Sequence, residues 1–252
     1  MLPASCEESG VPGSTPVART LSALGRLGSA ALDLLYPPRC VGCDSAGAFL
    51  CAACAGSLTV AAPPRCSRCW RPNPDAQPCF DCQAAEPAYD GLRSAFVNQG
   101  TARALVHALK YRQARVLAEP IAALMAEAAR RHGLEVDVLI PVPLSGLRGR
   151  VRGYNQAEVL AQALGRELDL PVWPRALTRR RHTSPQARAA DAEARRRNVT
   201  GAFACRERDV AGRNVLLLDD VTTTGATLAD CARALKEAGA QAVWGLTFAR
   251  ED

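Results

Sequence analysis

One stretch near the carboxyl end of the chain decides the fold, and it reads Asn214-Val-Leu-Leu-Leu-Asp-Asp-Val-Thr-Thr-Thr-Gly-Ala-Thr227. Residues 215–218 form a continuous apolar run, which is typical of a strand buried on both faces of a parallel sheet. We expect this strand to stop at Asp219 and Asp220, because two acids follow the run. Residues 228–238 then carry apolar positions at helical spacing. The stretch therefore predicts a strand, a tight loop and a helix.

The loop between the predicted strand and helix has the composition of an anion-binding site. Its small hydroxylated residues and Gly225 would direct N–H groups and hydroxyls to an anion at the positive end of the helix dipole. The carboxylates of Asp219 and Asp220 suit vicinal hydroxyls or a magnesium ion. A phosphate beside a diol indicates a sugar phosphate. The alternative is structural: the two acids end a strand and the threonines cap a helix.

The same stretch resembles the phosphoribosyl pyrophosphate (PRPP) motif of type I phosphoribosyltransferases. The resemblance implies that the acids are catalytic-site residues that hold the ribose hydroxyls, and that the loop holds the 5′-phosphate. Some members of this family, notably purine-salvage enzymes, have an acid where Thr223 stands, so a purine base is not expected as the substrate here. The residues that the resemblance assigns to PRPP are Asp219, Asp220, Val221, Thr222, Thr223, Thr224, Gly225, Ala226 and Thr227.

Length and cysteine content predict two domains. A chain of 252 residues with 48% hydrophobic content can bury one good core and a small annex. We expect a disordered or short helical segment over residues 1–35, a cysteine-rich module over residues 36–88 and an α/β domain over residues 91–252. Neither a signal peptide nor an 18-residue apolar run begins the chain, so we expect a cytoplasmic protein without membrane insertion.

Eight of the 11 cysteines lie in four Cys-x-x-Cys pairs. In a chain without a secretory signal, such pairs favour metal over disulfides, and two pairs joined by a short ribbon close a tetrahedral zinc site. Hairpin-sized gaps of 7 and 9 residues favour sequential pairing on two structural zinc ions. Interleaved pairing and an iron–sulfur cluster are the alternatives. The predicted ligands are Cys40, Cys43, Cys51, Cys54, Cys66, Cys69, Cys79 and Cys82.

Strand and helix patterns alternate from about residue 92 onwards. A helix is predicted over residues 116–131, and Pro120 is compatible with it only in the first turn. The alternation predicts an α/β fold with a parallel sheet, whose ligand lies at the carboxyl ends of the strands. Further strands are expected at residues 92–97, 136–142, 172–177, 201–205 and 243–248, and further helices at residues 101–110 and 157–168.

Two arginine-rich segments are candidates for binding phosphate groups. In the loop at residues 144–156, Arg148 and Arg152 are placed among glycines where they could grip pyrophosphate; the alternative is a solvated loop. Residues 175–197 hold eight arginines and two acids, an excess of +6 that equals the net charge of the chain. This segment is a candidate contact for single-stranded DNA or a solvated loop. Residues 185–198 also resemble the mobile loop before the PRPP motif in amidophosphoribosyltransferases, which implies a flap over PRPP with contacts from Gln186 and Arg188.

As a whole, the chain resembles the ComF family, in which a double zinc ribbon precedes a type I phosphoribosyltransferase-like domain. The resemblance implies a role in natural competence and uptake of single-stranded DNA, with PRPP, magnesium and structural zinc as ligands and DNA or competence proteins as partners. It names no acceptor. A transferase, a PRPP or nucleotide sensor that also binds DNA or a partner, and a structural adaptor are the three hypotheses. The blocks that carry the resemblance are residues 35–43, 107–111, 141–143 with 152–156, and 183–186 with 197–203.

Overall fold

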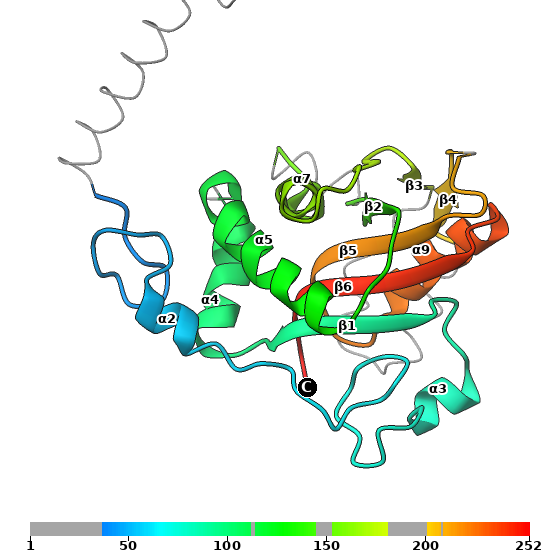
Figure 1. Cartoon of the computed structure of the whole chain (residues 1–252), viewed down its shortest axis with the longest axis horizontal. Helices are drawn as coiled ribbons and strands as arrows, with labels where there is room; N and C mark the ends of the chain where they lie inside the picture. The colour runs from blue at the N-terminus through cyan, green and yellow to red at the C-terminus, as the bar shows by residue number, and fades with distance from the viewer. Residues whose placement is uncertain (1–36, 112–113, 145–152, 181–200, 208) are drawn as a thin grey trace, which may run out of the picture.

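The structure is a computed structural model of the whole chain, and it describes residues 37–111, 114–144, 153–180, 201–207 and 209–252. A four-stranded parallel sheet in the order β1-β6-β5-β2 forms its centre (Figure 1). The predicted parallel α/β fold is therefore confirmed, whereas the segment expected at residues 1–35 lies outside the described residues. The strands of this sheet are β1 (Gly91–Val97), β2 (Val138–Pro141), β5 (Asn214–Thr222) and β6 (Ala242–Arg250).

The central strand β5 does not stop at the two acids, so that part of the prediction is wrong. It continues through Asp219 and Asp220 to Thr222, which pairs with Arg250 of β6. The apolar run marks only the fully buried part of the strand, and polar residues beyond it stay in the ladder because β6 is equally long. The continuation carries both acids on a paired and rigid backbone.

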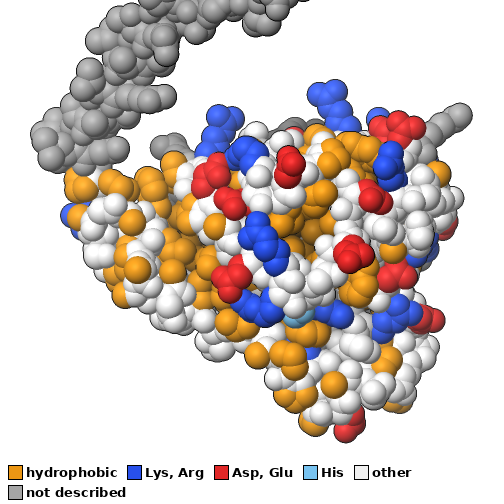
Figure 2. Space-filling model, in the orientation of Figure 1, with side chains coloured by type: hydrophobic (Ala, Val, Ile, Leu, Met, Phe, Trp, Pro, Cys, Tyr) orange, Lys and Arg blue, Asp and Glu red, His pale blue; other side chains and the backbone are white. Residues whose placement is uncertain are grey.

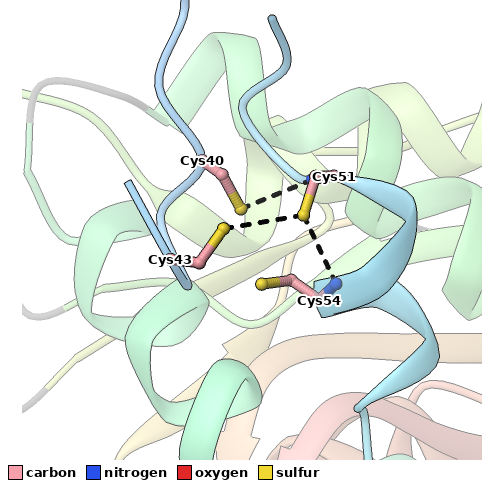
Figure 3. A group of neighbouring side chains, drawn as sticks. All are labelled: Cys40, Cys43, Cys51 and Cys54. Atoms are coloured by element: carbon pink, nitrogen blue, oxygen red, sulfur yellow. Dashed lines mark hydrogen bonds between the residues drawn. The ribbon is translucent and has the colours of Figure 1, made fainter. Parts of the chain in front are cut away.

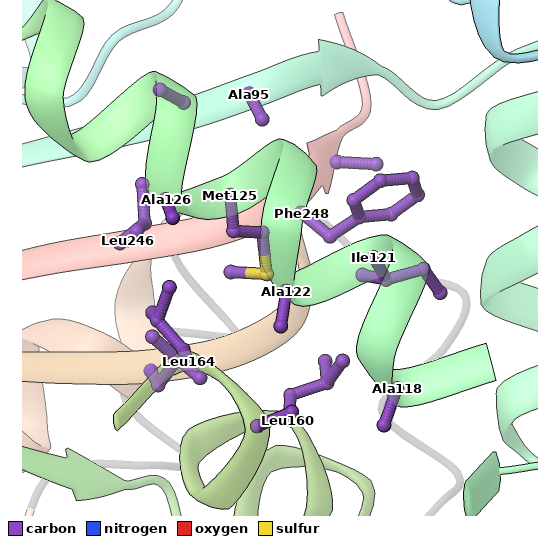
Figure 4. Close-up of a cluster of buried hydrophobic side chains, with 14 of the residues drawn as sticks. Ala95, Ala118, Ile121, Ala122, Met125, Ala126, Leu160, Leu164, Leu246 and Phe248 are labelled. Atoms are coloured by element: carbon purple, nitrogen blue, oxygen red, sulfur yellow. The ribbon is translucent and has the colours of Figure 1, made fainter. Parts of the chain in front are cut away.

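Helices cover both faces of the sheet because successive residues of β5 point to opposite sides. Leu216 and Leu218 pack with helices α4 (Gly100–Leu109), α5 (Ala114–Arg131) and α7 (Gln156–Leu168), whereas Val215 and Leu217 pack with α9 (Ala226–Glu237). Figure 4 shows the first of these cores, where Met125 lies among side chains of α5, α7 and β6. Among the described helices, none is long and apolar enough to cross a bilayer.

The position of Pro120 differs from the prediction. Helix α5 begins at Ala114, so Pro120 is its seventh residue rather than part of the first turn. Proline cannot donate to the carbonyl four positions earlier, which belongs to Val116. Val116 is 43% exposed, so water can reach the group that Pro120 leaves without a donor.

The segments around residues 172–177 and 201–205 do not both join the parallel sheet. Val172 makes a single parallel bridge to Leu139 of β2. A separate antiparallel pair is formed by β3 (Leu177–Arg179) and β4 (Phe203–Cys205). The start of β4 is held to α9 because the buried carboxylate of Asp230 accepts from the backbone N–H groups of Gly201, Ala202 and Phe203 at 2.9–3.2 Å.

The cysteine-rich module lies along the free edge of β1. Its two short helices are α2 (Ala52–Gly56) and α3 (Phe80–Ala84). Between them, Val60 forms an antiparallel bridge with Phe96, and the N–H of Ala61 donates to Ala95 O at 3.0 Å. The module thus satisfies an edge that would otherwise be open to pairing with another chain.

Candidate functional site

Two carboxylates lie at the carboxyl end of the central strand β5. Asp220 is 9% exposed, and the N–H groups of Asp220 and Val221 donate to Asp219 Oδ1 (2.9 Å) and Asp220 Oδ1 (2.8 Å). Burial raises the pKa of the Asp219 carboxyl well above its ordinary value, and the negative charge of Asp220 raises it further. A divalent cation or the hydroxyls of a diol would offset this repulsion, so the pair suits either ligand.

A lysine from another element acts on the carboxylate of Asp219. Lys110 is the C-cap residue of α4, and its positive charge opposes the rise in the pKa of Asp219. From the sequence, Lys110 belongs to a family block but has no assigned role in the site. Its rarity is the one available signal, because lysine occurs only at Lys110 and Lys236. The positive charge of Lys110 therefore adds to the electrostatics of the two acids.

The loop after β5 turns the chain directly into α9. Gly225 is the N-cap residue of this 12-residue helix and has a φ of +77°, a left-handed conformation that favours glycine. A Cβ at this position would lie 2.9 Å from Tyr89 Oη. Gly225 offers no side chain to cap the helix, so the positive end of the α9 dipole faces the loop. The arrangement is chemically suited to hold an anion.

A buried arginine lies behind this loop. Arg250, at the end of β6, is 1% exposed. Its guanidinium donates to Cys69 O (2.7 Å) and to Asp252 Oδ1 (2.8 Å), and more weakly to Thr223 O (3.4 Å). Sequence reasoning missed Arg250, because a charge at the end of an apolar run is typical of an exposed strand terminus. Its contacts link the loop to the cysteine-rich module.

The eight cysteines gather into two groups of four in sequential order, as the spacing favours. Cys40, Cys43, Cys51 and Cys54 form the first cysteine cluster (Figure 3), and Cys66, Cys69, Cys79 and Cys82 form the second. Within each cluster, the Sγ atoms lie within 4.8 Å of one another. The Sγ atoms of Cys43 and Cys51, and those of Cys69 and Cys79, are 3.7 Å apart. Tetrahedral zinc with four thiolates requires about 3.8 Å between sulfurs, so both clusters fit structural zinc.

Hydrogen bonds lower the pKa of one thiol in each cluster and raise the pKa of another, Cys54 in the first cluster and Cys82 in the second. In the first, the N–H of Cys51 points to Cys40 Sγ at 3.4 Å and lowers the pKa of that thiol to about 6. In the second, a hydrogen bond from Cys82 lowers the pKa of the Cys69 thiol to about 5. A thiolate is the form that binds metal. The four-sulfur geometry leaves no open coordination position, which is typical of structural rather than catalytic zinc.

Several predicted site residues lie outside the described part of the chain. These are the four candidates for pyrophosphate or flap contacts, and they stay predictions. The described residues on the two sides of residues 181–200 belong to the β3–β4 pair. The four residues are Arg148, Arg152, Gln186 and Arg188.

Comparison with known proteins gives matches over both parts of the chain. A family model described as double zinc ribbon domain matches residues 31–83, and one described as phosphoribosyl transferase domain matches residues 111–250. Competence protein F of Haemophilus influenzae is 33% identical over 224 residues, which cover 80% of this chain and 97% of that protein. The DNA utilization protein YhgH of Escherichia coli K12 is 34% identical over 184 residues, or 71% of this chain and 80% of YhgH.

Among solved structures, a glutamine PRPP amidotransferase from B. subtilis aligns with a TM-score of 0.36 and 20% identity, over 53% of this chain and 27% of that chain. The two sequence relatives match at higher identity and over more of this chain. The chain belongs to the ComF family, and it combines a double zinc ribbon with a phosphoribosyltransferase domain.

Proposed function

We propose that this protein binds PRPP, together with magnesium, at the carboxyl end of β5. Asp219 and Asp220 hold the ribose hydroxyls, and residues 223–227 hold the 5′-phosphate. The observation that carries this proposal is the pair of adjacent carboxylates, one with a raised pKa, placed directly before a glycine turn at the positive end of α9. Acids followed by an anion-binding turn match a diol next to a phosphate.

The described residues fit magnesium as well as the sugar. Carboxylate oxygens are hard ligands of the kind that magnesium prefers, and the ion binds through one or two carboxylates plus substrate phosphates. When bound, magnesium would neutralise charge on the pyrophosphate. Asp219 and Asp220 would orient the ribose, and Lys110 would add a positive charge beside it.

The proposed reaction transfers ribose 5-phosphate from PRPP to an acceptor. The acceptor's electron pair forms a bond to C1 of the ribose while the bond from C1 to pyrophosphate breaks, and pyrophosphate leaves with the electron pair. Thr223 stands where the purine-salvage enzymes of this family carry an acid, so the acceptor is proposed not to be a purine base. The activity is placed in the cytoplasm, where PRPP is made and used.

We place this activity in natural competence and the handling of single-stranded DNA. Support comes from the names of the relatives, a competence protein and a DNA utilization protein. On the face shown in Figure 2, basic and acidic side chains of the described residues are interspersed. The arginine excess lies instead in residues 175–197, so this segment is the proposed contact for DNA phosphates.

A sensor without transfer is the second candidate function. In this role PRPP or a nucleotide is a regulatory ligand, and the cysteine-rich module or the arginines hold DNA or a competence protein. The observation that favours it is the buried contact of Arg250 with both Thr223 O and Cys69 O, which joins the ligand loop to the cysteine-rich module.

Calorimetry with PRPP and magnesium tests the site. We expect the double variant Asp219→Asn with Asp220→Asn to bind at least about 100-fold more weakly, because two charge-assisted hydrogen bonds are worth about 1.5–3 kcal/mol each. Glu127→Gln with Glu167→Gln removes the same charge at exposed positions and should bind as wild type does. Unchanged affinity in the aspartate variant would refute the assignment.

Release of pyrophosphate separates the two candidate functions. Wild-type protein is incubated with PRPP, magnesium and a panel of bases and amines, and pyrophosphate is measured over time. Acceptor-dependent release that disappears in the double aspartate variant supports the transferase. Binding of PRPP without release for any acceptor supports the sensor.

A further inference from the structure

The two cysteine clusters differ in how they are attached to the sheet domain. The first cluster has two of its four cysteines buried, and its ribbon reaches α4, where Ser57 Oγ lies 3.0 Å from Thr101 Oγ1. In the part of the chain that the structure describes, no hydrogen bond or ion pair joins residues 40–54 to residues 219–227. The second cluster has three of its four cysteines buried and lies next to the end of β6. Among the described residues, the second cluster is therefore the one that hydrogen bonds connect to the candidate ligand site, through Arg250.

That connection runs through two buried arginines and one carboxylate. Arg65 is 6% exposed and donates to both carboxylate oxygens of Asp252, at 2.8 and 2.7 Å, and to Trp70 O at 3.0 Å. The same carboxylate accepts from Arg250 at 2.8 Å. A buried charge requires such partners, because its desolvation costs several kcal/mol. The network therefore fixes the guanidinium of Arg250 relative to the second cluster.

The two terminal nitrogens of Arg250 connect Cys69 of the second cluster to the loop after β5. One terminal nitrogen donates to the carbonyl of Cys69, and the other lies 3.4 Å from the carbonyl of Thr223. Cys69 belongs to a knuckle in which its own N–H points to Cys66 Sγ at 3.4 Å. Metal binding fixes such a knuckle, and loss of the metal unfolds it. The position of the Cys69 carbonyl, and with it Arg250, thus depends on the metal.

A second contact acts at the next part of the loop. Tyr89 is 2% exposed and lines a cavity of about 240 Å³ together with Cys69, Cys82 and Gly225. Its hydroxyl occupies the space beside Gly225, where a Cβ would come within 2.9 Å. The loop is therefore supported from the side of the second cluster at both Thr223 and Gly225.

We propose that Arg250 is a positioning residue through which metal binding at the second cysteine cluster, but not at the first, orders the loop of Thr223 to Gly225. The inference rests on the proposed function for its ligand, since an ordered loop is what would hold the 5′-phosphate of PRPP. The order of the loop itself is a property of the free protein and can be measured without PRPP.

Matched cysteine variants test the difference between the clusters. Cys51 and Cys79 are both partly exposed and stand at the N-caps of α2 and α3. In full-length zinc-loaded protein, each of Cys51→Ser and Cys79→Ser should lose one equivalent of zinc by metal analysis. Hydrogen exchange at amides 222–228 should become at least about 10-fold faster in Cys79→Ser, since a hydrogen bond to a charged group is worth about 1.5–3 kcal/mol. In Cys51→Ser it should match wild type.

Variants of Arg250 test the route. Arg250→Lys keeps the charge but cannot bridge two carbonyls, so it should retain two zinc ions and show the same faster exchange at amides 222–228. Adding Cys79→Ser to Arg250→Lys should accelerate exchange by less than the sum of the two single effects, because both changes break the contact through Arg250. Equal exchange in Cys51→Ser and Cys79→Ser, or additive effects of Cys79→Ser and Arg250→Lys, would overturn the proposal.

A second measurement keeps the test decisive if Cys79→Ser does not fold. Chelator is titrated into Cys51→Ser protein, which has metal only at the second cluster, and exchange at amides 222–228 is followed as that metal leaves. PRPP affinity is then measured at each metal content, and about a 10-fold loss is expected. If wild-type protein binds no PRPP, the proposed function fails, while the exchange experiments still decide whether the second cluster orders the loop.

Discussion

Gly225→Ala should destabilise the protein through two separable effects. The left-handed backbone at φ +77° costs an alanine about 1–2 kcal/mol. The new Cβ would also lie 2.9 Å from Tyr89 Oη, and crowding of this kind in a packed core costs about 1–3 kcal/mol. We therefore expect a loss of about 2–5 kcal/mol in the free energy of unfolding, measured by urea denaturation of zinc-loaded protein.

Two comparisons separate the backbone effect from the crowding. Gly133 also has a positive φ, +58°, but nothing lies within 4 Å of its added Cβ, so Gly133→Ala should cost only about 1–2 kcal/mol. Tyr89→Phe removes the hydroxyl and leaves Leu92 Cδ2, at 3.3 Å, as the nearest atom, so Gly225→Ala should cost about 1–2 kcal/mol in that background. Equal costs for both glycine variants, or no relief from Tyr89→Phe, would refute the reasoning.

Three further predictions concern Asp219, Asp230 and Arg180. The pKa of Asp219 is raised in the folded protein, so the unliganded protein loses stability as the pH rises from the ordinary aspartate pKa to the raised pKa. Asp219→Asn should therefore have a higher melting temperature than wild type at neutral pH. The difference in melting temperature should shrink as the pH is lowered. Asp230→Ala should cost about 3–5 kcal/mol in urea unfolding, because three backbone N–H groups lose a buried acceptor, whereas Glu237→Ala, at an ion pair whose carboxylate is 63% exposed, should stay within about 0.5 kcal/mol. If exposed Arg180 contacts DNA, Arg180→Ser should reduce the slope of log affinity against log salt for single-stranded DNA by about 0.7, with PRPP affinity retained; an unchanged slope would exclude that contact.

Features that depend on local pattern could be predicted from the sequence. Continuous apolar runs indicated the parallel strands, and the 7- and 9-residue gaps favoured the two sequential cysteine clusters that the structure shows. The order of strand, loop and helix also followed from residues 214–238, although the strand contains the two acids rather than ending before them. In each case neighbouring residues determine the geometry, so a single sequence contains enough information.

Features that depend on distant partners could not be predicted. The extension of β5 to Thr222 depends on pairing with Arg250, and the burial of Arg250 depends on Cys69, 181 positions earlier. The influence of Lys110 on Asp219 likewise joins two elements that no spacing rule connects. The strand expected at residues 201–205 pairs outside the main sheet because a single carboxylate, that of Asp230, holds its start to α9.

The contact between Arg65 and Asp252 also has a consequence for how the protein is made. Arg65 and Asp252 are separated by 187 positions. A ribosome that adds about 5–20 residues per second therefore needs about 10–40 s after Arg65 to supply the carboxylate of Asp252. During that interval the thiols of the second cluster leave the ribosome while Arg65 still lacks its counter-charge. The network that connects the second cluster to the loop after β5 can therefore close only after Asp252 has been made.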